Sequence, residues 1–308
     1  MTVSVVRDPI YAAHDPGAGH PESPARVRAI DAALRASDLA LHEIPARPAT
    51  REELARVHTP AYLDQLHALR GRSASLDPDT HLSPRSVDAA LAAAGGTIEL
   101  VRAVARGEAP PGLALVRPPG HHALGDRAMG FCLINNVAVA AQALRAEGLA
   151  ERIAIYDFDV HHGNGTEAIF YGDPNVLYCS THQWPFYPGT GARDDTGRGR
   201  GEGATLNVPL PEGTGDARMI EVTLDVLGPR LVDFAPDLIL ISAGFDPYED
   251  DPLGGFQVTV SGFRELALRW RDLAERLTGG KIAGVLEGGY DLDGLGASVT
   301  ALLEAWST

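Results

Sequence analysis

The chain has 308 residues, 44% of them hydrophobic, and a formal net charge of −15 from 26 basic and 41 acidic side chains. A chain of this length can bury a full core, and the charge argues against direct nucleic-acid binding, which depends on clustered Lys and Arg. A cationic substrate or protein tail is favoured instead.

The cysteine content and the amino-terminal sequence indicate the compartment. Two cysteines, Cys132 and Cys179, are too few to staple a protein of this size, and we expect both to be buried thiols in a reducing environment. The start MTVSVVRDPIYAAHDP has no apolar core of a signal peptide, and no uncharged apolar run reaches 18 residues. We therefore expect a cytoplasmic protein with no membrane partner.

Short β-like runs alternate with helical patterns along the chain. The expected strands are Val3–Val6, Leu41–Ile44, Leu113–Val116, Ile153–Tyr156, Val176–Ser180, Thr205–Val208, Leu238–Ser242 and Ile282–Leu286. The expected helices are Pro24–Arg35, Pro60–Leu69, Pro84–Arg106, Asn136–Glu147, Asp216–Phe234 and Ser261–Leu277. Alternation of this kind, with strands apolar on both faces, predicts an α/β fold: one domain over residues 1–308, with a mainly parallel eight-stranded sheet flanked by helices. The Gly- and Arg-rich segment 189–203 is expected to be a surface loop.

Ligands of open α/β sheets bind at the carboxyl ends of the strands, so polar residues that follow each strand are the candidates for chemistry. The first such segment is RPPGHHA, where two prolines and Gly120 force a turn that presents His121 and His122 together. Imidazole titrates near neutral pH, which suits proton transfer. On its own, a histidine pair is more often a polar surface pair.

The second segment is IYDFDVHHGNGT. Strand alternation places Asp157, Asp159 and His161 on one face and the apolar Phe158 and Val160 on the other. Unpaired charges inside a protein are costly, so three converging polar groups indicate a bound cation. The alternative is a strand end whose carboxylates accept hydrogen bonds from loop amides.

Two further strand ends complete a possible site. The segment AGFDP sets Asp246 in a turn bounded by Gly and Pro, and LEGGYDL presents Tyr290 after two glycines. Each is an ordinary turn or packing residue by itself. Together with Asp159 and His161, Asp246 supplies the three ligands that a catalytic zinc uses while it keeps one position open. A neighbouring histidine would take a proton from water, and Tyr290 would donate to the developing oxyanion.

These motifs, in this order, resemble the zinc-dependent histone deacetylase superfamily. The similarity spans roughly residues 117–292 and rests on RPPGHHA, GFCLINNVAVAA, DFDVHHGNGT, FYPGTG, SAGFDPYEDDPLGG and LEGGYDL, with HPESPARVRAI nearer the start. The resemblance implies the arginase-deacetylase fold. It also implies zinc ligands at Asp159, His161 and Asp246, a proton-transfer pair at His121 and His122, and carbonyl polarisation by Tyr290.

The resemblance implies roles for neighbouring residues too. Asp157 corresponds to the acid that orients His121 and that shares a structural potassium site with Ser180. Asn164 stands behind His122, as in class II-like members and their bacterial relatives. Because Asn is neutral, we expect His122 to be less readily protonated than in members with Asp at this place.

The substrate tunnel can be assigned in the same way. Gly130, Phe131 and Tyr187 match the tunnel wall that holds an acyl-lysine stem, although the family commonly has Phe where Tyr187 stands. Leu253 matches the entrance position at which polyamine-selective relatives carry an acid, so it speaks against strict polyamine selectivity. Alternation turns His162 away from the ligands. Four further histidines are expected to lie behind the ligands, at the surface or at the pocket rim rather than to bind the metal: His20, His58, His81 and His182.

The sequence thus predicts a zinc-dependent amidohydrolase that removes acetyl or another short acyl group from lysine or a related amine. The alternatives are an acetylpolyamine amidohydrolase and a non-catalytic acyl-lysine binding protein, although the latter would typically have lost Tyr290 or a ligand. A two-manganese ureohydrolase is disfavoured because His162 and Gly163 follow His161 where a further Asp would be needed. Oligomeric state and physiological substrate stay open.

Overall fold

An eight-stranded parallel sheet runs through the centre of the computed structural model, which describes residues 2–307. The strand order is β2-β1-β5-β10-β9-β6-β7-β8, and each neighbouring pair is parallel. The strands are β1 (Thr2–Val6), β2 (Ala40–Glu43), β5 (Gly112–Ala114), β6 (Ile153–Asp157), β7 (Val176–Gln183), β8 (Thr205–Leu210), β9 (Leu238–Ala243) and β10 (Ile282–Leu286). All eight predicted strands are confirmed, with ends that differ by a few residues.

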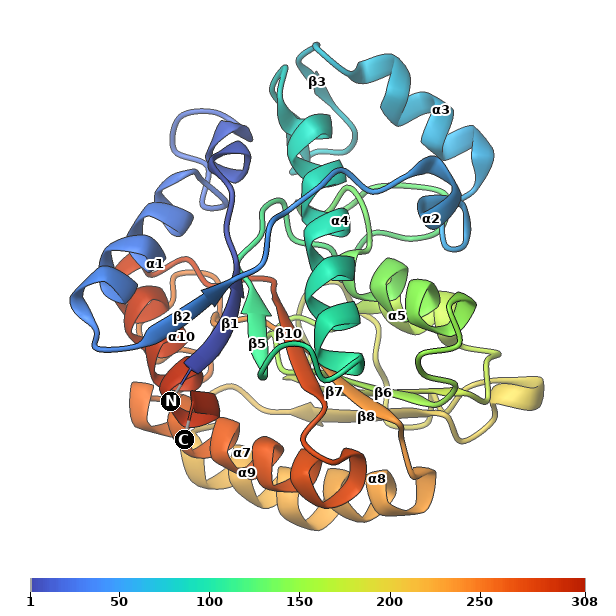
Figure 1. The fold of residues 1–308 in the computed structure, drawn as a ribbon, viewed down its shortest axis with the longest axis vertical. Coiled ribbons are helices and arrows are strands. Elements are labelled where there is room, and N and C mark those ends of the chain that lie inside the picture. The colour runs from blue at the N-terminus through green and yellow to red at the C-terminus, as the bar shows by residue number, and fades with distance from the viewer. Residues whose placement is uncertain (1, 308) are drawn as a thin grey trace.

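Helices cover both faces of the sheet (Figure 1). One layer packs its own hydrophobic cluster against the sheet and contains α1 (Ala25–Ala36), α7 (Asp216–Val222), α8 (Gly228–Phe234), α9 (Val260–Thr278) and α10 (Leu292–Ser307). The other layer contains α2 (Arg51–Ala55), α3 (Pro60–Leu69), α4 (Ser86–Ala105), α5 (Asn136–Ala146) and α6 (Asn164–Phe170). This three-layer arrangement explains why the strands are apolar on both faces.

Several helices differ from the prediction. The single helix expected over Asp216–Phe234 is α7 and α8 joined by a π-helical turn at Thr223–Leu227. Pro229, in the first turn of α8, has no N–H for the carbonyl four residues before it, which accounts for a changed hydrogen-bond pattern there. The sequence prediction missed α2, α6 and α10, as well as the short antiparallel pair β3 (Ala74–Ser75) and β4 (His81–Leu82).

The topology fixes where chemistry can occur. The four strands that precede the polar motifs, β5, β10, β9 and β6, are consecutive in the middle of the sheet. Because all are parallel, their carboxyl ends meet at one edge, and the loops that follow them converge.

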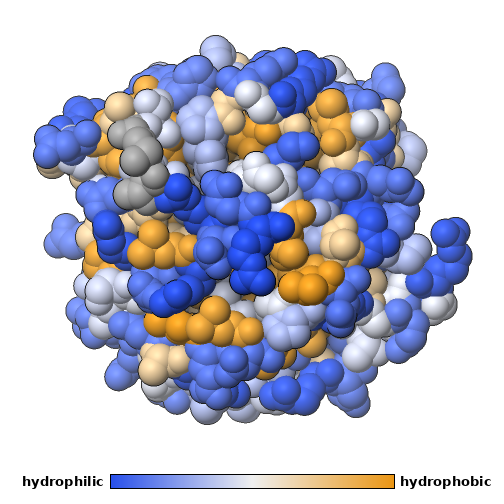
Figure 2. Space-filling view, turned by 60° about the horizontal axis from the view of Figure 1, so that its bottom comes forward, coloured by the Kyte–Doolittle hydropathy of each residue, from blue (hydrophilic) through white to orange (hydrophobic). Residues whose placement is uncertain are grey.

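The surface is mainly hydrophilic on the face drawn in Figure 2, where hydrophobic side chains form small separate patches. Among residues 2–307, no helix has the combination of length and apolarity that crossing a lipid bilayer requires.

Candidate active site

Asp159, His161 and Asp246 lie together at the carboxyl edge of the sheet. One donor atom from each lies within 4.8 Å of the others. The Nδ1 atom of His161 is 3.0 Å from Asp159 Oδ1 and 3.1 Å from Asp246 Oδ2. Because β6 ends at Asp157, Asp159 and His161 belong to the following loop rather than to the strand, yet they still point to one place. The geometry is that of a three-ligand metal site.

The electrostatics of this group fit a divalent cation. Burial and the negative charge of Asp159 raise the pKa of Asp246 to about 7. Burial alone would also raise the pKa of Asp159, but the charges on His121 and His161 outweigh it and hold that pKa below its ordinary value. Two buried carboxylates that repel each other beside an imidazole form a donor set that suits zinc or a similar ion.

Glycines allow the backbone to approach this group closely. A Cβ atom on Gly288 would lie 2.1 Å from Asp246 Oδ2, and one on Gly244 would lie 2.1 Å from Asp159 Oδ2. Gly288 instead donates its backbone N–H to Asp159 Oδ2 at 2.8 Å. On the pocket side, Gly130 has a positive φ of 55°, and a Cβ there would lie 2.5 Å from Cδ2 of His122. Side chains at these positions would displace the functional groups.

The paired histidines are held by different partners. His121 Nδ1 is 3.0 Å from Asp157 Oδ2, and His122 Nδ1 is 2.8 Å from Asn164 Oδ1. The Asn164 amide donates from Nδ2 to Met129 Sδ, so its oxygen faces His122 and accepts from Nδ1. Nε2 of His122 is therefore the nitrogen that can accept a proton.

The two imidazoles also differ in charge. Burial, followed by the charges on His121 and His161, holds the pKa of His122 well below its ordinary value. Burial alone would lower the pKa of His121, but Asp159 and Asp157 outweigh it and raise that pKa well above its ordinary value. His122 is thus the neutral member of the pair, although the hydrogen bond with Asn164 by itself raises its pKa. The expectation that it is less readily protonated than in relatives that carry Asp stays a prediction.

Tyr290 is fixed from two sides. Its backbone N–H donates to Asp251 Oδ2 at 2.6 Å, and the Arg26 guanidinium lies 5.0 Å from its ring centroid. Arg26 also donates to the backbone carbonyls of Glu287 and Gly289, at 2.6 Å each. Sequence reasoning missed Arg26 and Asp251, although each stands inside a motif that carries the family resemblance.

A pocket of about 420 Å³ opens onto these groups. His122, His161 and Tyr290 line it, as do the four residues predicted for the tunnel: Gly130, Phe131, Tyr187 and Leu253. Sequence reasoning missed the remaining side chains of the wall, namely Asp79, Gln183, Phe186, Glu212 and Pro252. Phe186 stacks on His161 with ring centroids 5.4 Å apart. The pocket thus combines aromatic walls with carboxylates.

The other predicted residues lie around this centre. Asp157 and Ser180 are direct neighbours in the β6–β7 register, and the Ser180 hydroxyl is 2.9 Å from Nδ1 of His182. His162 points away from the metal ligands, as alternation predicts, toward Thr190 and Glu167. The other three histidines expected outside the ligand set, His20, His58 and His81, also lie outside the Asp159–His161–Asp246 group.

The parallel sheet, with this acid–histidine group, paired imidazoles and tyrosine at its carboxyl edge, defines an α/β amide hydrolase of the arginase-deacetylase fold. The family model of the histone deacetylase domain matches residues 20–306, and the chain belongs to this family. The exact boundaries of the predicted single domain, 1–308, stay a prediction.

Relatives of known name support the assignment. A probable deacetylase from Archaeoglobus fulgidus is 39% identical over 298 residues, which cover 96% of this chain and 83% of the relative. A histone deacetylase-like amidohydrolase from Pseudomonas aeruginosa is 43% identical over 277 residues, or 89% of this chain and 73% of the relative. The crystal structure of the HDA15 HD domain superposes with a TM-score of 0.94 at 41% identity, covering 99% of this chain and 88% of that one.

Proposed function

We propose that this protein is a zinc-dependent deacetylase that hydrolyses the amide of acetyl-lysine or of a related short-acyl amine. The observation that carries the proposal is the convergence of Asp159, His161 and Asp246 with His122 and Tyr290 at one pocket. Asp159, His161 and Asp246 would hold the ion, which when bound supplies a Lewis acid for the amide carbonyl and acidifies water.

The side chains then divide the remaining work. His122 accepts a proton from the attacking water at Nε2 and returns it to the nitrogen of the leaving amine. Asn164 keeps the proton of His122 on Nδ1, and Asp157 does the same for His121. Tyr290 donates a hydrogen bond from its hydroxyl to the carbonyl oxygen as negative charge develops there.

The walls of the pocket support a substrate with an alkyl stem and a cationic or polar distal end. Phe131, Tyr187 and Leu253 offer apolar surface, and the charged residues that line the pocket within the described chain are Asp79 and Glu212, apart from its histidines. The two carboxylates keep an acetylpolyamine as the second candidate substrate, whereas Leu253 at the entrance favours acyl-lysine. We also propose that Asp157 and Ser180 take part in a structural potassium site and that the protein acts in the cytoplasm.

A substrate competition tests this function. The zinc-loaded protein is offered an acetyl-lysine peptide and acetylputrescine, and kcat/KM is measured for each. We expect both to be hydrolysed, with the peptide preferred. A preference for the polyamine of about a hundredfold or more, equivalent to roughly 2.7 kcal/mol, would overturn the choice of substrate. Absence of turnover on any short-acyl amine would overturn the function itself.

A further inference from the structure

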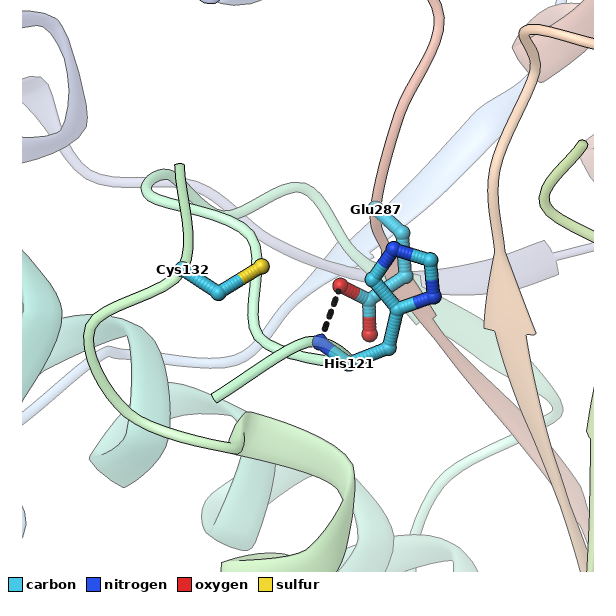
Figure 3. Close-up of side chains that lie close together, drawn as sticks. All are labelled: His121, Cys132 and Glu287. Atoms are coloured by element: carbon cyan, nitrogen blue, oxygen red, sulfur yellow. Dashed lines mark hydrogen bonds between the residues drawn. The ribbon is translucent and has the colours of Figure 1, made fainter. Parts of the chain in front are cut away.

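Glu287 is a fully buried carboxylate that directly follows β10, and the proposed mechanism does not use it. Its Oε2 accepts the backbone N–H of Gly120 at 2.6 Å and that of His121 at 3.1 Å. Its Oε1 accepts the hydroxyl of Ser242 at 3.1 Å. Figure 3 shows the carboxylate beside the His121 backbone, with the bond to its N–H drawn. The side chain therefore links the turn after β5 to the ends of β9 and β10.

The opposite side of this turn is also closed. A Cβ on Gly120 would lie 2.5 Å from the backbone nitrogen of Asn136, and the Asn136 amide donates to Pro118 O at 3.1 Å. The turn that carries the histidines is thus held between the first residue of α5 and the Glu287 carboxylate. If either support is lost, the position of the turn is no longer fixed from that side.

The same region could be taken for a second metal site, because donor atoms of His121, Cys132 and Glu287 lie within 4.8 Å of one another. Three observations argue against this. Both Glu287 oxygens already accept hydrogen bonds, and His121 uses Nδ1 for Asp157. Burial raises the pKa of the Cys132 thiol well above its ordinary value, so the thiolate that a metal requires is disfavoured. The hydrogen bonds, rather than metal binding, account for the placement of Glu287.

We propose that Glu287 is a positioning residue that holds the Gly120–His121 peptide and so sets the location of both imidazoles relative to the Asp159–His161–Asp246 group. The proposal rests on the proposed function for its kinetic consequence. Proton transfer requires the imidazole within hydrogen-bond reach of its partner, and a displacement of about 1 Å can cost on the order of 100-fold in rate. Glu287 is not among the residues that line the pocket, so its replacement should leave the substrate-binding walls intact.

The main test is Glu287→Gln, which keeps the shape of the side chain but replaces one accepting oxygen with an NH₂ group and leaves the other as a neutral, weaker acceptor. We expect kcat to fall about 30- to 100-fold, with KM within about twofold of the original value. The matched control is Glu53→Gln, the same change at a buried carboxylate in α2 that accepts the Thr50 backbone N–H at 2.7 Å. This control is expected to lower Tm and leave kcat unchanged.

A spectroscopic measurement tests the same proposal without activity. In NMR spectra of the protein, Glu287→Gln is expected to shift the amide proton resonances of Gly120 and His121 and the imidazole nitrogen resonances of His121 and His122. Glu53→Gln is expected to shift none of these. Unchanged resonances in folded Glu287→Gln, or a kcat equal to that of the unmodified protein, would overturn the proposal.

Failure of the variant to fold and failure of the proposed function can each be distinguished from failure of this proposal. If Glu287→Gln does not fold, Ser242→Ala replaces it, since that change removes only the hydroxyl that orients Oε1. We then expect kcat to fall about three- to tenfold at constant KM, and an unaltered kcat would overturn the proposal. If the unmodified protein hydrolyses no short-acyl amine, the proposed function fails, while the amide and imidazole resonances still decide whether Glu287 holds the turn.

Discussion

The position of Tyr290 in the candidate site is fixed by one backbone hydrogen bond and by contacts of its ring. The side chain lies on the pocket beside His122 and His161, and its backbone is tied to Asp251. Its ring centroid is 5.9 Å from that of Phe131, edge to face, and the Arg26 guanidinium lies over the ring. The hydroxyl is thus the only part of Tyr290 whose removal leaves these contacts in place.

We therefore predict that Tyr290→Phe lowers kcat by at least about 100-fold, because it deletes one donor to the developing oxyanion. Tm is expected to change by less than about two degrees, since packing and backbone contacts remain. Steady-state kinetics and thermal unfolding by circular dichroism check both statements. Activity that survives unchanged would contradict the role of Tyr290.

At the residue scale, sequence motifs predicted the candidate catalytic groups and two of their partners, Asp157 and Asn164, but not the long-range support from Glu287. Asp159, His161, Asp246 and Tyr290 each stand in a recognisable turn after a strand. Glu287 lies 167 positions from Gly120, and that hydrogen bond exists only because β5 and β10 are neighbours in the sheet. A single sequence carries no local signal for contacts of this kind.

At the scale of elements, apolar runs predicted the strands well because a strand covered on both faces must be apolar throughout. The helix α10 was not predicted, because its sequence LDGLGASVTALLEAWS contains two glycines, which have low helix propensity. The structure explains them: a Cβ on Gly294 would lie 2.3 Å from the Tyr248 ring, and one on Gly296 would be 3.1 Å from the Cβ of Ala33 in α1. Close packing between elements decides such positions.

His58 joins two helices and should make stability depend on pH. It precedes α3, its Nε2 accepts the backbone N–H of Asn135, the N-cap of α5, at 3.1 Å, and its Nδ1 donates to Leu124 O at 3.0 Å. Burial lowers the pKa of His58 to about 4. The unfolded chain, with an ordinary value near 6.5, therefore binds the proton more readily than the folded one.

The neutral form of His58 thus contributes stability that is fully present above about pH 6.5 and is lost as pH falls toward 4. We predict that His58→Gln is less stable at pH 7.5 and that its unfolding free energy declines less between pH 6.5 and 4.5. Urea unfolding across this range measures the difference. His42→Gln, a change at an exposed histidine of β2, should keep the original slope; an identical slope in His58→Gln would refute the argument.

At the scale of the whole molecule, the candidate metal ligands tie together the loops after β6 and β9, which are neighbouring strands. Without a cation, the buried carboxylates of Asp159 and Asp246 repel each other. A ligand present at about 1,000 times its Kd stabilises the folded state by about 4 kcal/mol. Metal removal should therefore affect stability as well as turnover.

We predict that a chelator abolishes hydrolysis and lowers Tm by several degrees, and that added zinc restores both. Calorimetry with and without the chelator measures the shift in Tm. In Asp246→Asn the repulsion is relieved and a ligand is weakened, so the chelator should change Tm much less. Equal turnover and equal Tm before and after metal removal would contradict a metal-dependent site.

The glycine beside His122 has an evolutionary consequence. Any side chain at position 130 would collide with the imidazole, whereas the sheet and its two helical layers would remain intact. A single base change in a glycine codon can introduce such a side chain. A duplicated gene could thus lose its chemistry in one step while every ligating and proton-carrying residue is retained, so inspection of those residues alone would not distinguish an active copy from a silent one.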